Sequence, residues 1–429
     1  MAKPDLKHIV VFEHQKLLVD QGEQYLSESQ YQALVNYYGN HSPFYSLIRN
    51  GVQFCEYVGA LQIGDTLIEV LPKADNSNDT GMWQNLLVNM IRSVWGFPVK
   101  ESGSSHLKLR HNSVLDLYFE LFVVEVEFLV RRGLVKKYIR EERNAKALKG
   151  KLSITKHLQK NIVHKERFYI QTTQYTINHE LHQILYCTLQ LLSRLNRNGI
   201  LASRIGSLML NFPEQSRLKV TPQAFERIRY DRKTIIYKKA IDIAELLLLN
   251  YHPDVSQGRR NVLALMFDMN ALWEQFVVNL LRKSMKSYTV AGQVTRKFWK
   301  SEHLSSNMRP DIVLTNPQSN KRIVLDTKWK NLGGKAPSPE DLRQMYVYHE
   351  YFNAEKVALI YPGEGSNTSG QFYLKDQTAL DNKFCHVLQI PVNRDFILWK
   401  ASIINVISGL VCLFDPQLHE DSLIIKAKD

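Results

Sequence analysis

Two acidic residues and a lysine occur in two short apolar segments of the C-terminal third. The segments are RPDIVL (309–314) and IVLDTKW (323–329). Side chains two residues apart on a β-strand lie on the same face, so Asp326 and Lys328 should project together. A hairpin between the segments would place Asp311 beside them. The pattern predicts two carboxylates and one amine converging at the edge of an apolar sheet.

This combination suits metal-dependent phosphate chemistry. Two adjacent carboxylates repel each other unless a cation lies between them, and Mg²⁺ or Mn²⁺ prefers such hard oxygen ligands. We therefore predict Asp311 and Asp326 as metal ligands, with a metal-activated water attacking a phosphodiester. Lys328 would position that water or stabilise charge on the phosphate. Thr327 should point to the opposite face, but its backbone carbonyl is a candidate further ligand.

Three residues on flanking helices are candidates for supporting roles. Glu274 lies at the edge of an apolar helix face and is a candidate metal ligand. Gln344 and Tyr348 are four residues apart, so they share one helix face and could contact DNA or brace the lysine. Each of these residues could instead have no role in a site. Lys328 would then only pair with Asp326 on a surface hairpin, and the three helical side chains would be solvated.

The elements around these residues predict a compact α/β unit over residues 256–429, a mixed sheet flanked by helices. A helix is expected over Asp268–Met285, and strands over 311–314 and 322–329 with a turn at 316–320. Ser338 should cap a helix that reaches about Phe352. A buried strand, 356–361, follows.

The preceding residues predict two further regions. Residues 1–110 form a mixed, β-rich region, with short strands over 54–71, a loop over 75–80 and a helix over 82–94. Residues 111–255 are expected to be mostly helical, with helices over 115–130, 179–195 and 238–249.

Most of the excess positive charge lies in the middle region. The chain has a formal charge of +13, and residues 131–167 contain 13 Lys or Arg and three Glu, a net +10. This stretch predicts contact with DNA phosphates, which positions a protein without reading sequence. A solvated helix face, RNA or an acidic protein surface are the alternatives. The candidate DNA-binding residues are Arg131, Arg132, Lys136, Lys137, Arg140, Lys146, Lys149 and Lys151.

Several other classes of protein are disfavoured. No run of about 20 apolar residues would span a membrane, and the first residues lack the apolar core of a signal peptide. The four cysteines are far apart, so a cytoplasmic location is the simplest expectation. The histidines of HELH (179–182) lack the spacing of a zinc motif, and Asn178 is expected to cap the following helix. GGKA (333–336) is not a phosphate-binding loop, so no bound nucleotide is expected.

The motifs together resemble a known family. PD (310–311) and DTK (326–328) resemble the core of the PD-(D/E)xK nuclease superfamily, and Gln344 and Tyr348 resemble its downstream pair. The segments VLPK (70–73), LKGKL (148–152) and MNALWE (269–274) make the chain similar to the McrC family, the nuclease subunits of McrBC-type modification-dependent restriction systems.

This resemblance implies a Mg²⁺-dependent DNA endonuclease of antiviral defence. Such subunits cleave DNA only with a separate McrB-like AAA+ GTPase, which recognises modified cytosine such as 5-methylcytosine and translocates DNA. It also implies that the N-terminal region docks this partner. Two other functions stay open: a self-sufficient nuclease of DNA repair or recombination, and a non-catalytic DNA-binding adaptor that stimulates an NTPase.

Overall fold

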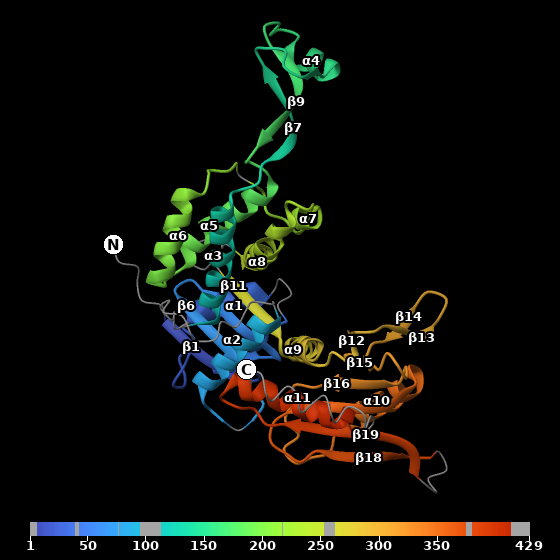
Figure 1. Ribbon diagram of the computed structural model, residues 1–429. Helices are drawn as coiled ribbons and strands as arrows, with labels where there is room; N and C mark the ends of the chain where they lie inside the picture. Colours follow the sequence, from blue (N-terminus) through green and yellow to red (C-terminus); the bar gives the residue numbers. More distant parts are fainter. Residues whose placement is uncertain are drawn as a thin grey trace. The chain divides into compact units, whose positions relative to one another are not determined.

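The computed structural model describes residues 7–38, 43–75, 77–94, 113–216, 218–252, 262–374 and 380–412 (Figure 1). The chain forms two compact units, each built from non-adjacent segments. Unit 1 comprises Met1–His8, Ala60–Ile68 and Leu107–Leu265, and unit 2 comprises Ile9–Gly59, Glu69–His106 and Met266–Asp429. The division of the sequence into three consecutive regions stays a prediction.

The N-terminal part is rich in strands, as its sequence predicts. A five-stranded sheet has the order β1 (Lys7–Phe12), β6 (Thr66–Leu71), β5 (Tyr57–Ile63), β11 (Val262–Asp268) and β10 (Tyr251–His252). A smaller sheet contains β2 (Lys16–Leu18), β4 (Gly51–Phe54) and β3 (Tyr45–Ile48). Two helices, α1 (Glu28–Tyr38) and α2 (Thr80–Val94), belong to the same part of the sequence. The strands expected over 54–71 and the helix expected over 82–94 are confirmed.

Unit 1 contains a group of helices. They are α3 (Val114–Arg132), α5 (Glu180–Leu195), α6 (Gly199–Asn211), α7 (Pro222–Glu226) and α8 (Lys238–Leu249), with a short 3-10 helix at Ile235–Tyr237. The three helices expected here are confirmed within two residues. The Ser113 side chain caps α3 by accepting a hydrogen bond from the backbone N–H of Asp116. Arg204 of α6 binds both carboxylate oxygens of Glu127 on α3, at 2.8 and 2.9 Å.

The basic stretch is mainly a β-ribbon, and not the solvated helix face considered as an alternative. It forms an antiparallel ribbon in which β7 (Lys137–Ala145) pairs along its whole length with β9 (Phe168–Thr176). A short strand, β8 (Lys151–Leu152), pairs with the other edge of β9, and α4 (Ile154–Asn161) follows it. Charged residues occupy most positions of β7, so the apolar alternation that would indicate a strand is weak.

Gly150 explains why the LKGKL segment needs a glycine. Its φ is +107°, and a Cβ there would lie 2.4 Å from the carbonyl oxygen of Gln171 on β9. Only glycine allows the chain to approach the ribbon this closely before β8 begins.

The sheet of unit 2 that carries the candidate site has six strands. Their order is β12 (Thr289–Gly292), β15 (Ile312–Thr315), β16 (Arg322–Thr327), β17 (Ala354–Pro362), β19 (Leu380–Ile390) and β18 (Thr368–Tyr373). β16, β17 and β19 run parallel, and the other pairings are antiparallel. This confirms the mixed sheet expected from the sequence. A separate two-stranded hairpin of β13 (Arg296–Lys300) and β14 (Ser305–Met308) follows β12.

Three helices pack on this sheet: α9 (Met269–Ser284), α10 (Pro339–Phe352) and α11 (Phe396–Cys412). Apolar residues of α10, including Met345, pack with Val324 and Val357, so α10 covers the sheet face that carries alternate residues of β16. The Ser338 side chain caps α10, as predicted, by accepting a hydrogen bond from the N–H of Asp341. Among the described helices, none combines the length and apolar composition that crossing a membrane requires.

Candidate active site

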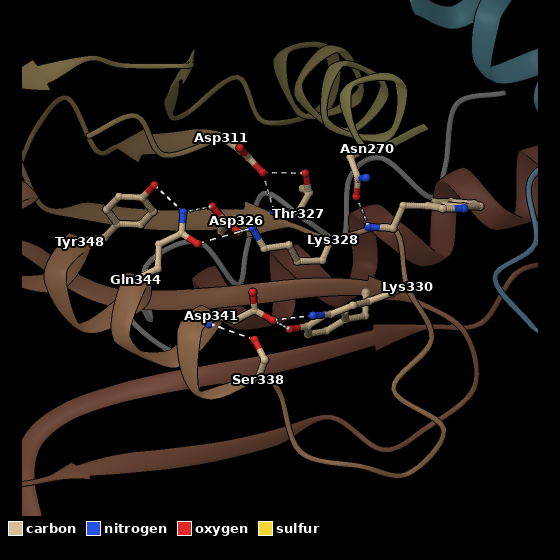
Figure 2. Close-up of polar contacts among 12 residues, drawn as sticks. Asn270, Asp311, Asp326, Thr327, Lys328, Lys330, Ser338, Asp341, Gln344 and Tyr348 are labelled. Carbon is tan, nitrogen blue, oxygen red and sulfur yellow. Dashed lines mark hydrogen bonds and ion pairs between the residues drawn. The ribbon is translucent and has the colours of Figure 1, made fainter. Parts of the chain in front are cut away.

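The hairpin of β15 and β16 brings the predicted acidic residues to one edge of the sheet (Figure 2). Ile312 pairs with Leu325, so extending this register by one residue places Asp311 opposite Asp326. Asp326 is only 1% exposed. A carboxylate so deeply buried at the end of a strand is costly unless it has polar partners, and its partners define the site.

Asp326 is held by a lysine and by the glutamine of α10. The Lys328 ammonium lies 2.8 Å from Asp326 Oδ2, and Gln344 Nε2 donates to Asp326 Oδ1 at 3.4 Å. Gln344 Nε2 also lies 2.7 Å from the Tyr348 hydroxyl, and Lys328 Nζ lies 3.5 Å from Gln344 Oε1. The structure therefore brings together Asp326, Lys328, Gln344 and Tyr348 (Figure 2).

Asp311 has different partners from those that strand alternation suggests. Its Oδ2 accepts hydrogen bonds from the backbone N–H of Thr327 at 2.7 Å and from the Thr327 hydroxyl at 2.8 Å (Figure 2). The expectation that Thr327 points away from the acidic residues is therefore wrong. The strand ends at Thr327, and its side chain turns to the Asp311 carboxylate.

Glu274 is linked by hydrogen bonds of Gln293 to the sheet edge that carries Asp311 and Asp326. Gln293 Nε2 donates to Glu274 Oε2 at 3.3 Å, and the Gln293 backbone N–H donates to the Asp311 carbonyl oxygen at 2.9 Å. Gln293 has a φ of +53°, a left-handed conformation that is uncommon for residues other than glycine. This strained residue fixes the spacing between α9 and the start of β15, and no motif in the sequence indicated it.

The carboxylates at this edge resist ionisation. Burial, and then the nearby charge of Asp311, raise the pKa of Glu274 to about 7 and that of Asp326 to about 6. For Lys328, burial favours the neutral amine, but the ion pair with Asp326 outweighs it and the pKa of the ammonium is raised. The site therefore concentrates negative charge that a single lysine only partly offsets.

The chemistry of the carboxylates at this edge suits a hard divalent cation, although the side chains do not converge closely enough to form a complete set of metal ligands. Within the described residues, no three His, Cys, Asp or Glu side chains are gathered as a finished metal site. However, the charge of Asp311 raises the pKa of both Glu274 and Asp326, and a bound cation would relieve this like-charge repulsion. Carboxylate oxygens are also the ligands that Mg²⁺ and Mn²⁺ prefer.

A second group of contacts fixes the chain just after Lys328. The backbone N–H of Trp329 donates to Asn270 Oδ1 at 3.1 Å (Figure 2). The Trp329 indole N–H donates to the buried carboxylate of Glu13 at 2.9 Å, and Glu13 also accepts from the backbone N–H of Lys73 at 2.7 Å. The segments VLPK, MNALWE and DTKW thus meet at one point, a convergence that the sequence did not reveal.

Aromatic rings surround this point. Trp329 makes edge contacts with Trp83 and Trp273, with ring centroids 6.4 and 5.5 Å apart. Trp273 stacks on Trp399 at 5.4 Å. The cluster explains why a tryptophan follows Lys328 and another occupies α9, since their rings form the apolar support of the candidate site.

An ion pair at the start of α10 completes the site. Lys330 Nζ lies 2.7 Å from Asp341 Oδ2, which also accepts a hydrogen bond from the Tyr361 hydroxyl at 3.2 Å (Figure 2). Burial opposes ionisation of Asp341, but Lys330 and Ser338 outweigh it and lower its pKa. Asp341 therefore stays ionised and keeps α10 aligned with the segment that carries Lys328.

The candidate DNA-binding residues all belong to unit 1, whereas the carboxylates belong to unit 2. Arg131 and Arg132 are in the last turn of α3, Lys137 and Arg140 are on β7, and Lys151 is on β8. Lys136 precedes β7, and Lys146 and Lys149 lie between β7 and β8. Arg131 pairs with Glu127 at 3.5 Å. No acidic side chain among the described residues pairs with the other seven.

The two histidines of HELH are part of the protein interior. His182 Nδ1 donates to the Ile177 carbonyl at 2.6 Å, and its Nε2 lies 3.1 Å from the Tyr237 hydroxyl. Burial lowers the pKa of His182 to about 4. The cap expected from Asn178 is wrong: the cap position is His179, and the Asn178 side chain accepts hydrogen bonds from Gln183 and Ser216 instead.

Comparison with known proteins shows that this chain is a component of a restriction system. The chain belongs to the family of McrBC 5-methylcytosine restriction system components, whose family model matches residues 52–362. It is 23% identical over 304 residues to the Escherichia coli K12 type IV methyl-directed restriction enzyme EcoKMcrBC, covering 64% of this chain and 84% of that protein.

A solved structure has the same fold over nearly the whole chain. It is a refined half-complex from a tetradecameric assembly of Thermococcus gammatolerans McrB AAA+ hexamers with bound McrC. The match has a TM-score of 0.66 at 19% identity and covers 94% of this chain and all of the matched chain. A cryo-EM structure of the T. gammatolerans McrBC complex matches 66% of this chain and 89% of its own, with a TM-score of 0.47 at 19% identity.

Proposed function

We propose that this chain is the Mg²⁺-dependent DNA endonuclease subunit of a McrBC-like restriction system. The observation that carries the proposal is the edge of the six-stranded sheet, where Asp311 and Asp326 lie opposite each other and Lys328 contacts Asp326. These residues resemble the core motif of the PD-(D/E)xK nuclease superfamily, which supports the proposal. The family membership supports the restriction function.

In this proposal Asp311, Asp326 and Glu274 would hold the metal ion, with the Thr327 carbonyl as a further ligand. When bound, the ion supplies charge stabilisation for the phosphate and an activated water. Lys328 orients the attacking water, and Gln344 keeps the ammonium and the Asp326 carboxylate in register through contacts with both. Asn270 and Glu13 hold the chain beyond Lys328 through Trp329.

We further propose that an AAA+ GTPase activates the chain and that the basic ribbon of unit 1 contacts DNA phosphates. Support for the partner comes from the structural relative, which contains McrB AAA+ hexamers with bound McrC. Support for the DNA contact comes from the seven cations that have no acidic partner among the described residues. An acidic protein surface would satisfy the same cations and is the outcome to exclude.

A cleavage assay tests the proposal. The full-length chain is incubated with methylated or unmethylated DNA, Mg²⁺, and the candidate AAA+ partner with GTP or ATP. We expect cleavage that requires the partner and methylation and is lost in Asp326→Ala and Lys328→Ala. Lys321→Ala is the matched control, since Lys321 forms an exposed ion pair with Glu355 beyond the opposite end of β16.

The outcomes separate the three candidate functions. Cleavage with Mg²⁺ alone, unaffected by the partner, would indicate a self-sufficient nuclease. Full cleavage by Asp326→Ala and Lys328→Ala in the reconstituted system would indicate a non-catalytic adaptor and would end the nuclease proposal for this chain.

A further inference from the structure

A groove of about 670 Å³ lies between α10 and the β13–β14 hairpin. Phe298, Asn307 and Arg309 line one side, and Arg343, Gln344 and Tyr348 line the other. Gln344 and Tyr348 belong to the hydrogen-bonded chain that ends on Asp326. Two residues that line the groove therefore also belong to the candidate active site, and a third, Arg309, lies two positions before Asp311 in the sequence.

The hairpin is strongly cationic. Residues 296–309 contain four Lys or Arg and one Glu, a net charge of +3. Lys297, Lys300 and Arg309 are exposed, and no acidic side chain in the described part of the chain forms a salt bridge with them, although the charge of Arg309 lowers the pKa of Glu274. Across the groove, Glu340 on the same helix is the only acidic partner of Arg343 within the described residues, at 3.2 Å in an exposed pair that contributes little. These cations are available to an anionic ligand.

Exposed aromatic rings lie among these cations. Phe298 is 48% exposed and makes an edge contact with Tyr351 of α10, with ring centroids 5.3 Å apart. Trp299 is 53% exposed, and no aromatic ring among the described residues contacts it. A β-bulge between Lys297 and Trp299 breaks the regular alternation of the strand. Arg296 anchors the base of the hairpin on the Tyr351 carbonyl and the Phe352 ring.

Unpaired cations with exposed aromatic rings are the combination by which proteins hold a nucleic-acid strand: cations contact phosphates, and rings stack on bases. We propose that the β13–β14 hairpin and this groove hold the DNA strand that enters the active site. Arg309 and Arg343 contact the phosphates nearest the scissile bond, Lys297 and Lys300 contact flanking phosphates, and Trp299 stacks on an unstacked base. This inference rests on the proposed nuclease function.

Photo-cross-linking locates the contact. The full-length chain is irradiated with a 30-base-pair duplex that carries 5-iodouracil in a short central unpaired segment, in Ca²⁺ without a partner, and the cross-linked peptide is identified by mass spectrometry. We expect cross-links in residues 296–309. Cross-links confined to other segments, such as the ribbon of unit 1, would overturn the inference.

Binding measured by fluorescence anisotropy at several salt concentrations separates the roles. Arg309→Ala should lower the slope of log K against log salt by about 0.9, the contribution of one phosphate contact. Trp299→Ala should weaken binding about 5- to 150-fold without changing that slope, as loss of one stacked base predicts, and Trp299→Phe should restore most of it.

Two exposed residues of unit 2 outside the groove serve as matched controls: Lys283→Ala on α9 and Tyr373→Ala on β18. Hairpin variants that bind like these controls would refute the inference. The proposed function would still stand if Asp326→Asn abolished cleavage in the same preparations, so the two failures are distinguishable.

Discussion

Replacing Asp326 by asparagine should abolish cleavage and stabilise the folded protein. Burial and the charge of Asp311 raise the pKa of Asp326 from 3.8 to about 6, and this value already includes the attraction of Lys328. A raised carboxyl pKa means that the folded state loses stability as pH rises from about 4 to 6. At 1.36 kcal/mol per unit, the ionised carboxylate costs on the order of 3 kcal/mol above pH 6. Asparagine is neutral and avoids this cost.

Tryptophan fluorescence can follow the unit that carries the site, because the tryptophans among the described residues all lie in unit 2. They are Trp83, Trp273, Trp299, Trp329 and Trp399. Urea unfolding of metal-free wild type and variant is compared between pH 4 and 8. We expect no difference near pH 4, a growing advantage of Asp326→Asn up to about pH 6, and a constant advantage above it.

Asp341→Asn is a control that should change the free energy of unfolding in the opposite direction. Because its interactions lower the pKa of Asp341, this variant should be less stable than wild type at neutral pH, and the loss should shrink as the pH falls. If Asp326→Asn were less stable than wild type at pH 8, the Asp326 carboxylate would be a stabilising group, and the reasoning about a charge-strained site would be wrong.

Two further predictions concern residues that position the site. Asn270→Ala removes the acceptor of the Trp329 N–H, so we expect cleavage to fall at least tenfold with a loss of about 1–2 kcal/mol in unfolding free energy. Asn279→Ala on the same helix should leave cleavage unchanged, and equal losses in both variants would exclude a specific role for Asn270. Gln293→Leu removes a hydrogen bond that lowers the pKa of Glu274, so at subsaturating Mg²⁺, where protons compete with the metal for this carboxylate, the acid limb of the pH–rate profile should move to higher pH. A downward or absent shift would show that Glu274 does not control this limb.

The sequence was sufficient to predict an element where a short local pattern is compatible with only one structure. Apolar segments over 311–314 and 322–329, separated by a turn, predicted the hairpin, although its second strand ends at Thr327, and the Ser338 cap predicted the start of α10. The acidic and lysine side chains at the ends of those strands could therefore be placed from their spacing. Their approach follows from the antiparallel register alone.

The sequence was insufficient where the structure depends on distant segments. Glu13 and Trp329 are 316 residues apart, and their hydrogen bond has no local signature. The ribbon of unit 1 was missed because charged residues on β7 hide the strand period, and pairing with β9 decides its conformation. Thr327 turned to Asp311 because the strand ends there, which a strict two-residue alternation cannot anticipate.

The central claim, that these carboxylates hold a divalent cation, is tested most directly by crystals of the full chain grown with Mn²⁺. An anomalous difference map should show one peak within coordinating distance of both Asp311 and Asp326, with the Lys328 ammonium displaced from its present position 2.8 Å from Asp326 Oδ2. A saturating Mn²⁺ concentration that produces no peak at this edge, with Lys328 still paired to Asp326, would contradict the claim.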